Sequence, residues 1–188
     1  MRELFQNLNF DFLPLVDMSL QRDARIKRIP EEKINPTLID LLDQSDLVIG
    51  VAESFYTPPY FVQAVAHIDG TPFEVEETWP SRCKLNYTFG EVSTKTRWHD
   101  VPTDKKNKLD YRKNSIGYNY NAYAIADCSL IAEEKLSEWH IFEAGIPHSI
   151  YNPTNAPRWT ISFQLVKKNS PGWMSYLESK ELFLPWIK

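Results

Sequence analysis

From Val48 onward the chain reads as a succession of short segments in which hydrophobic and polar residues alternate. A period of two is typical of β-strands, whose successive side chains point to opposite faces of a sheet. The alternation predicts strands at Val48–Phe55, Tyr60–Asp69, Arg82–Phe89, Tyr120–Ile131, His140–Ala144, His148–Asn152 and Arg158–Val166. Turn residues separate them, as at Thr57-Pro58-Pro59, Asp69-Gly70-Thr71-Pro72 and Pro153 to Pro157.

The two ends of the chain have a different pattern. Asn35 followed by Pro36, with hydrophobic residues at helical spacing behind them, predicts a short helix over Pro36–Leu42. We expect one further strand near Phe12–Val16 and a closing helix between Pro171 and Glu181. The expected organisation is a lead-in at residues 1–47, a β core at 48–170 and a helical segment at 171–188. The fold class is mostly β, a sandwich or barrel with jelly rolls and cupins among the candidates.

Several predicted strands carry polar residues along one whole face. The polar sets are Arg158, Thr160, Ser162 and Gln164 in one strand, Arg82, Lys84, Asn86 and Thr88 in a second, and His67 and Asp69 at the end of a third. A polar face on a single strand is ordinarily a face that meets water. Three such strands favour a sheet curled around a wet interior site.

Composition narrows the classes of protein. The chain has 188 residues and a net charge of −4, which argues against a dedicated nucleic-acid binder. No apolar run is long enough to span a bilayer, and no secretory signal is visible at the N-terminus. Cys83 and Cys128 match neither a disulfide framework nor a metal-binding spacing. We therefore expect a cytoplasmic protein without a membrane partner.

His67 and Asp69 form the first candidate for chemistry. On a strand they share one face, about 6.6 to 7 Å apart at Cα, close enough to bind one metal ion. A third nitrogen ligand would complete the two-histidine, one-carboxylate set typical of non-haem Fe(II). The remaining histidines are His99, His140 and His148. His140 reads as an ordinary sheet residue and His99 as a strand-end residue, which leaves His148.

The segment around His148 predicts a hairpin. If Asn152 pairs with Arg158, then His148 pairs with Ser162, and His148 and Arg158 share a face about 13 Å apart at Cα. A metal at His148 and a guanidinium at Arg158 would leave a gap suited to a short dicarboxylate. An arginine fork is suited to the carboxylate that does not bind the metal.

With these residues in place, the chain resembles the 2-oxoglutarate- and Fe(II)-dependent dioxygenases, most closely the aspartyl/asparaginyl- or prolyl-hydroxylase-like enzymes. The resemblance covers about residues 48–166 and rests on the order His67, Asp69, His148, Arg158. It implies a double-stranded β-helix, a distorted jelly roll, with His67, Asp69 and His148 as iron ligands. It also implies that Arg158 binds 2-oxoglutarate, with Ser162 and Asn86 as further cosubstrate contacts. The implied reaction uses Fe(II), 2-oxoglutarate and O₂ to hydroxylate a substrate.

Two other functions stay open. One is a cupin-like module that binds a metal without catalysis, for which Arg158 would have no purpose. The other is a nucleic-acid-modifying enzyme of the same family that uses the basic loop 105–113. That loop contains Lys105, Lys106, Lys108, Arg112 and Lys113. The same residues are also consistent with a solvated loop or a lid over the site, because Asp104 and Asp110 reduce the net positive charge of the segment. Nothing in the sequence identifies the hydroxylated substrate or the oligomeric state.

Overall fold

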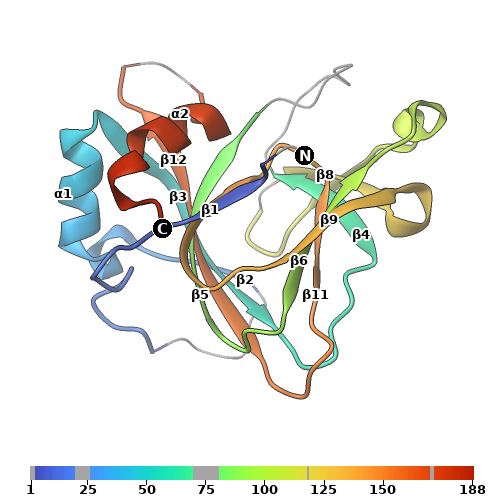
Figure 1. Cartoon of the computed structure of the whole chain (residues 1–188), viewed down its shortest axis with the longest axis horizontal. Helices are drawn as coiled ribbons and strands as arrows, with labels where there is room; N and C mark the ends of the chain where they lie inside the picture. The colour runs from blue at the N-terminus through green and yellow to red at the C-terminus, as the bar shows by residue number, and fades with distance from the viewer. Residues whose placement is uncertain (1–2, 20–25, 70–80, 118, 170–171) are drawn as a thin grey trace.

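A computed structural model describes residues 3–19, 26–69, 81–117, 119–169 and 172–188. Within these ranges, twelve strands form two six-stranded sheets that face each other (Figure 1). The first sheet has the order β1 (Phe5–Asn7), β10 (Glu138–Glu143), β5 (Cys83–Gly90), β12 (Arg158–Lys167), β3 (Leu47–Thr57), β2 (Ile26–Arg28). The second has the order β7 (Asp110–Lys113), β8 (Asn119–Ala124), β4 (Val65–Asp69), β11 (His148–Tyr151), β6 (Lys95–Asp100), β9 (Ser129–Lys135). The prediction of a mostly β chain is confirmed.

The pairing of the strands is nested along the chain. Strand β3 pairs with β12, β4 with β11, β5 with β10, and β6 with β9, all antiparallel. The chain therefore runs out through four strands and returns through four partners, crossing between the sheets at each step. Strands β7 and β8 are inserted at the turning point and extend the second sheet beyond β4.

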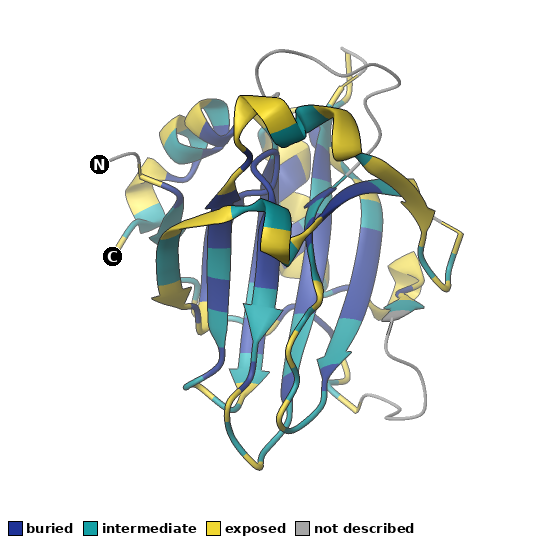
Figure 2. Ribbon diagram, turned by 90° about the vertical axis from the view of Figure 1, so that its right-hand side faces the viewer, coloured by how far each residue is buried: buried dark blue, intermediate teal, exposed yellow. Residues whose placement is uncertain are grey.

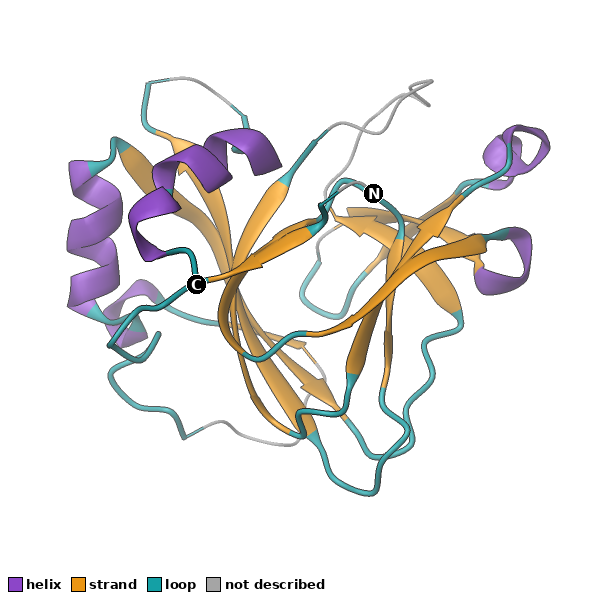
Figure 3. Cartoon of the chain, viewed as in Figure 1, coloured by secondary structure: helices purple, strands orange, loops and turns teal. Residues whose placement is uncertain are grey.

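Both α-helices lie outside the first sheet (Figure 3). Helix α1 spans Pro36–Gln44, with the Asn35 side chain accepting a hydrogen bond from the Thr37 N–H. Helix α2 spans Tyr176–Leu182 and begins with a capping box of Ser175 and Glu178. Short 3₁₀ turns lie at Glu31–Lys33 (η1), Thr103–Lys108 (η2), Ile125–Asp127 (η3) and Leu184–Trp186 (η4). No helix in the described ranges is long and apolar enough to cross a membrane.

The first sheet has one apolar and one polar face. Its apolar face packs against α1 and the C-terminal segment, in a core that includes Leu38, Leu42, Leu85, Ile161, Phe163 and Phe183. Burying each such side chain contributes about 1.5 to 3 kcal/mol, so this face stabilises the fold. Exposed residues gather in the helices, the connecting loops and the edge strands β7 and β9, whereas the long strands of the first sheet are largely buried or half-buried (Figure 2). The opposite, polar face of the sheet is left for the space between the sheets.

Some of the secondary-structure predictions are wrong. The single strand expected over Tyr120–Ile131 is two strands, β8 and β9, separated by η3. They lie in different parts of the second sheet, since β8 pairs with β4 and β9 with β6, and the turn carries the chain between them. Near Phe12–Val16 the described chain has an isolated bridge from Leu15 to Ile34 instead of a strand. The lead-in instead supplies β1 and β2 to the first sheet.

The expected hairpin between His148 and Arg158 is also wrong. Strands β11 and β12 belong to different sheets, and the connection between them crosses from one sheet to the other. The Asn152 side chain holds this connection by donating to the carbonyls of Pro58 and Ala156. His148 pairs with His67 and Trp98, and Ser162 pairs with Asn86 and Glu53. The expected turn at Gly70–Pro72 and the boundary at residues 170–171 lie outside the described residues.

Candidate metal centre

Three potential metal ligands meet in the second sheet, on its face towards the first. His67 and Asp69 lie two residues apart on β4, and His148 begins β11 directly opposite His67. The His67 Nε2 atom lies 3.7 Å from Asp69 Oδ1, and the His148 Nε2 atom lies 3.5 Å from Asp69 Oδ2. One ligand atom from each residue falls within 4.8 Å of the others. The three residues predicted as ligands are therefore brought together, although the expected hairpin is absent.

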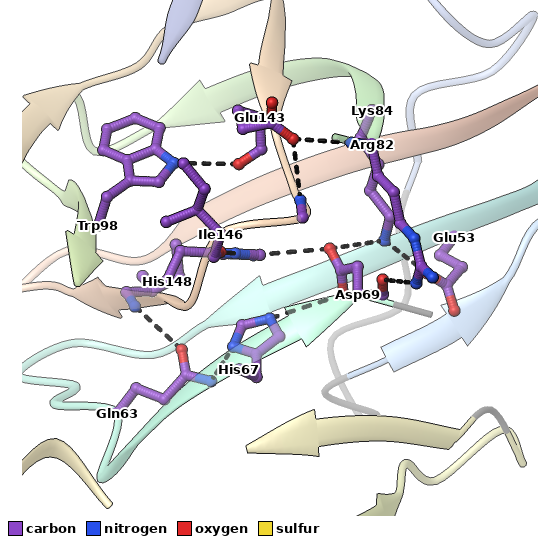
Figure 4. A network of polar contacts seen from close by, with 12 residues as sticks. Glu53, Gln63, His67, Asp69, Arg82, Lys84, Trp98, Glu143, Ile146 and His148 are labelled. Atoms are coloured by element: carbon purple, nitrogen blue, oxygen red, sulfur yellow. Dashed lines mark hydrogen bonds and ion pairs between the residues drawn. The ribbon is translucent and has the colours of Figure 1, made fainter. Parts of the chain in front are cut away.

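Hydrogen bonds orient both imidazoles. The His148 Nδ1 atom lies 2.9 Å from the Ile146 carbonyl oxygen, which can only accept, so Nδ1 donates this hydrogen bond and Nε2 is directed towards Asp69. On the other ring, Gln63 Nε2 lies 2.9 Å from His67 Nδ1. The same Gln63 side chain accepts a hydrogen bond from the Ile150 N–H at 2.9 Å. Gln63 thus holds the His67 ring against β11 with Nε2 towards Asp69 (Figure 4).

The charge state of this group suits a divalent cation. Burial, followed by the proximity of His148, lowers the pKa of His67 to about 3, so this ring is neutral near pH 7. Burial opposes ionisation of Asp69, yet the Lys84 ammonium and the two histidines hold the pKa of that carboxyl well below its usual range. An unprotonated imidazole and an ionised carboxylate are the forms in which these side chains bind metals.

Lys84 on β5 reaches the metal-ligand candidates His67, Asp69 and His148 from the first sheet. Its Nζ atom lies 3.2 Å from Asp69 Oδ2 and 3.5 Å from Glu53 Oε2 (Figure 4). Burial lowers the pKa of Lys84, but the two carboxylates raise it by more, so the net shift is upward. This buried ammonium is paired with carboxylates on both sides.

Glu143 supports the loop that leads to His148. One of its carboxylate oxygens accepts the N–H groups of Arg82 and Gly145, at 2.7 and 3.2 Å, and the other accepts the Ser81 hydroxyl at 2.7 Å. The Trp98 indole N–H donates to the Glu143 carbonyl (Figure 4). These contacts tie the segment between β10 and β11 to the start of β5 and to β6.

Arg158 is the first residue of β12 and is 2% exposed. Its Nη2 atom donates to the Thr88 hydroxyl at 3.3 Å, and its Nε and Nη1 atoms have no hydrogen-bond partner among the described residues. No carboxylate in the described part of the chain forms an ion pair with it. Burial alone lowers the pKa of this guanidinium to about 10.

A cavity of about 690 Å³ joins the metal-ligand group to Arg158. Its wall includes His67, Asp69, His148, Arg158, Ser162 and Asn86, which are all the predicted site residues. The Asn86 Oδ1 and Ser162 Oγ atoms are buried without a partner among the described residues. Buried polar atoms are nearly always hydrogen-bonded, so this wall is suited to a polar ligand.

The other two histidines do not reach the metal-ligand group. His99 lies on β6, with its Nε2 atom 2.8 Å from the Ser149 hydroxyl. His140 lies on β10 in the first sheet, with its Nδ1 atom 3.0 Å from the Glu138 carbonyl oxygen. In the described residues, the group of His, Cys, Asp and Glu close enough to hold a metal is His67, Asp69 and His148.

Sequence reasoning did not assign a site role to Glu53, Gln63, Lys84 or Glu143. The alternation of β5 already placed Lys84 on the polar face, and Glu53 is the one charged residue in a mostly apolar strand. Gln63 precedes His67 by four residues, a weak signal for contact. No sequence signal identifies Glu143, because its partners are backbone N–H groups far away in the chain.

The basic loop is largely neutralised by its own neighbours. Lys105 pairs with Asp104 at 3.4 Å, Lys108 with Asp127 at 2.8 Å, and Arg112 with Asp110 at 2.8 Å. Arg112 and Lys113 also line the cavity, at its β7 side. The loop is therefore better placed to border the cavity than to bind a phosphate backbone.

Comparison with known proteins gives little. No protein-family profile matches the sequence, and no curated protein matches it. A crystal structure of EvdMO1 is similar with a TM-score of 0.37 and 14% sequence identity. The match covers 73% of this chain and 31% of the EvdMO1 chain. A likeness of this size supports no conclusion about fold or function.

Proposed function

We propose that the protein is an Fe(II)- and 2-oxoglutarate-dependent dioxygenase that hydroxylates a substrate still to be identified. We propose with it that the fold is a double-stranded β-helix. Support for the fold comes from the nested pairing of β3 with β12, β4 with β11, β5 with β10 and β6 with β9. A two-stranded ribbon wound in this way is the arrangement of a jelly roll.

The observation that carries the function is the Arg158 guanidinium. It is buried, has no carboxylate partner among the described residues, and faces the same cavity as the metal-ligand group. An isolated buried charge is costly, so its retention favours an anion that arrives as a ligand. A guanidinium suits a carboxylate, to which it donates two parallel hydrogen bonds. A metal-binding module without catalysis has no need for such a group.

The donor set fits the metal that this function requires. His67, Asp69 and His148 would hold Fe(II), and Arg158 would hold the distal carboxylate of 2-oxoglutarate, with Ser162 and Asn86 beside it. A bound Fe(II), with 2-oxoglutarate and O₂, supplies the oxidation that couples decarboxylation to hydroxylation. The chain's own residues position the ligands and exclude bulk water.

The cavity charges are consistent with this pair of ligands. Among the buried and half-buried side chains of the cavity wall, Asp69 and Glu53 contribute two negative charges, and Lys84 and Arg158 contribute two positive ones. Arg112 and Lys113, at the β7 side, are exposed to solvent. A divalent cation and a dicarboxylate together add no net charge. The site can therefore accept both together without leaving an uncompensated buried charge.

Turnover of 2-oxoglutarate to succinate under Fe(II), with and without candidate substrates, tests the function. We expect the wild-type chain to release succinate and His148→Ala to lose this activity. His99→Gln is the matched control, because His99 is a buried histidine of the same sheet outside the metal-ligand group. Full activity in His148→Ala, or a wild-type chain that neither binds nor consumes 2-oxoglutarate, would refute the proposal.

A further inference from the structure

His140 is a buried histidine with no part in the metal-ligand group. It lies on β10 with no exposed surface, directly opposite Asn86 of β5, which in turn pairs with Ser162 of β12. Directly paired residues of antiparallel strands point to the same face. His140 therefore points to the polar face of the first sheet, in one row with two residues of the cavity wall.

The state of the His140 ring is fixed by its neighbours. The Nδ1 atom lies 3.0 Å from the Glu138 carbonyl oxygen, an acceptor, so Nδ1 carries the proton. The Nε2 atom is then a bare acceptor, and it is buried with no partner among the described residues. Burial and the charge of Arg158 lower the pKa of His140 to about 3, which keeps Nε2 unprotonated near neutral pH.

Arg158 supplies donors on the same side of the sheet. Its Nη2 atom reaches Thr88 on β5, two residues along that strand from Asn86, the partner of His140. Its Nε and Nη1 atoms are buried donors without partners. An acceptor without a donor and donors without an acceptor thus lie on the same face of the first sheet, near enough for the Arg158 charge to act on His140. A hydrogen bond between them would satisfy both.

We propose that His140 is a positioning residue of the dicarboxylate subsite. Its Nε2 atom accepts a hydrogen bond, directly or through one ordered water, from the guanidinium edge that the ligand carboxylate does not use. This contact turns the fork of Arg158 to face the cavity. His140 does not touch the carboxylate itself, because two acceptors repel each other. The inference rests on the proposed function, since it requires that Arg158 bind a dicarboxylate.

Binding of 2-oxoglutarate and of pyruvate to the anaerobic Fe(II) protein tests this role. Pyruvate has the same keto-acid end but lacks the distal carboxylate. In His140→Phe, which keeps a ring but removes the acceptor, we expect the 2-oxoglutarate Kd to rise about tenfold or more. The Kd values for pyruvate and for Fe(II) stay as in the wild type. His140→Leu serves in the same assay if His140→Phe does not fold.

A double-mutant cycle separates positioning from a general structural role. If His140 acts through Arg158, the double variant His140→Phe/Arg158→Met binds 2-oxoglutarate as weakly as Arg158→Met alone. Independent, multiplying losses would overturn the inference, as would an unchanged 2-oxoglutarate Kd in His140→Phe or an equal loss of pyruvate binding. In those cases the wild type still binds 2-oxoglutarate and the proposed function stands. Absence of 2-oxoglutarate binding to the wild type refutes the proposed function and this inference together.

Discussion

Two buried cations face the same cavity from neighbouring strands, and only one of them is neutralised by the described protein. Lys84 lies 3.2 Å from Asp69 and 3.5 Å from Glu53. The Arg158 guanidinium has a single hydrogen bond, to the Thr88 hydroxyl, and no carboxylate partner among the described residues. Folding therefore pairs the Lys84 ammonium with carboxylates beside His67 and Asp69, and it leaves the Arg158 guanidinium without a carboxylate partner among the described residues.

The same contrast appears in the proton affinities of the two side chains. Burial lowers the pKa of both groups. For Lys84 the adjacent carboxylates reverse this effect and raise the pKa, whereas for Arg158 burial alone acts and the pKa falls to about 10. The difference lies in the partners, since both side chains are almost fully buried.

The largest expected effect is on the stability of the metal-free protein. Lys84→Met leaves Asp69 and Glu53 buried near each other without their cation, so we expect a loss of about 3 to 5 kcal/mol in the free energy of unfolding. Arg158→Met removes a charge that has no carboxylate partner, so we expect no loss, or a gain. Urea unfolding at pH 7 measures both. Equal losses of stability in the two variants would contradict the difference in charge pairing between Lys84 and Arg158.

The next prediction concerns Gln63, which contacts the candidate metal ligand His67. In Gln63→Leu the His67 ring loses the contact that orients it, and we expect metal affinity to fall about 10- to 100-fold, as when other outer-shell partners of metal ligands are removed. Gln164→Leu is the matched control, because Gln164 lines the same cavity and its side chain has no hydrogen bond to a predicted ligand residue in the described part of the chain. Competition with a chromophoric chelator gives both affinities. Similar affinities in the two variants would contradict the role given to Gln63.

A smaller effect concerns acid stability. His140 has a pKa of about 3 in the folded chain, against an ordinary value near 6.5 when unfolded. Between pH 6.5 and 3, acidification protonates this residue in the unfolded chain alone and so lowers the free energy of unfolding, by up to about 1.4 kcal/mol per pH unit. In His140→Phe this contribution is absent. Urea unfolding of the metal-free variant at pH 7, 6 and 5 should therefore give a shallower decline than in the wild type, and parallel declines would exclude the effect.

The basic loop has the smallest expected effect. Since Lys105, Lys108 and Arg112 each have a carboxylate partner, we expect no salt-dependent binding of oligonucleotides at physiological ionic strength. Fluorescence anisotropy at several salt concentrations measures this. Tight binding that weakens steeply with salt would instead favour a nucleic-acid substrate.

The alternation of polar and apolar residues predicted correctly which side chains share a face of a strand, whereas the predicted pairing between strands was wrong. The polar sets of two strands were readable in the sequence. The whole set of β12, with Lys84 and Asn86 of β5, lines the cavity because the opposite, apolar sets pack against the helices. The predicted partner of His148 was wrong, because a turn rich in proline looks the same whether it closes a hairpin or crosses between sheets. The correct partner, His67, lies 81 residues away in the chain, and no local pattern reports such a contact.

The residues missed by sequence analysis share this non-local character. Lys84 contacts the candidate site only because β5 and β4 face each other across the cavity, which places its ammonium beside Asp69. Glu143 acts through backbone N–H groups, which carry no residue identity at all. The third histidine of the candidate group, in contrast, was predicted from the sequence. His148 was selected because the segment that follows it leads to Arg158.

Anaerobic titration of the Fe(II)-loaded protein with 2-oxoglutarate, followed by the visible charge-transfer band, tests the central claim most directly. We predict saturable binding to the wild type and a Kd roughly 30- to 1000-fold higher in Arg158→Met, equivalent to about 2 to 4 kcal/mol, with Arg158→Lys in between. Fe(II) affinity should be the same in all three. An unchanged 2-oxoglutarate Kd in Arg158→Met would contradict the account, because the unpartnered cation would then have no part in binding the cosubstrate.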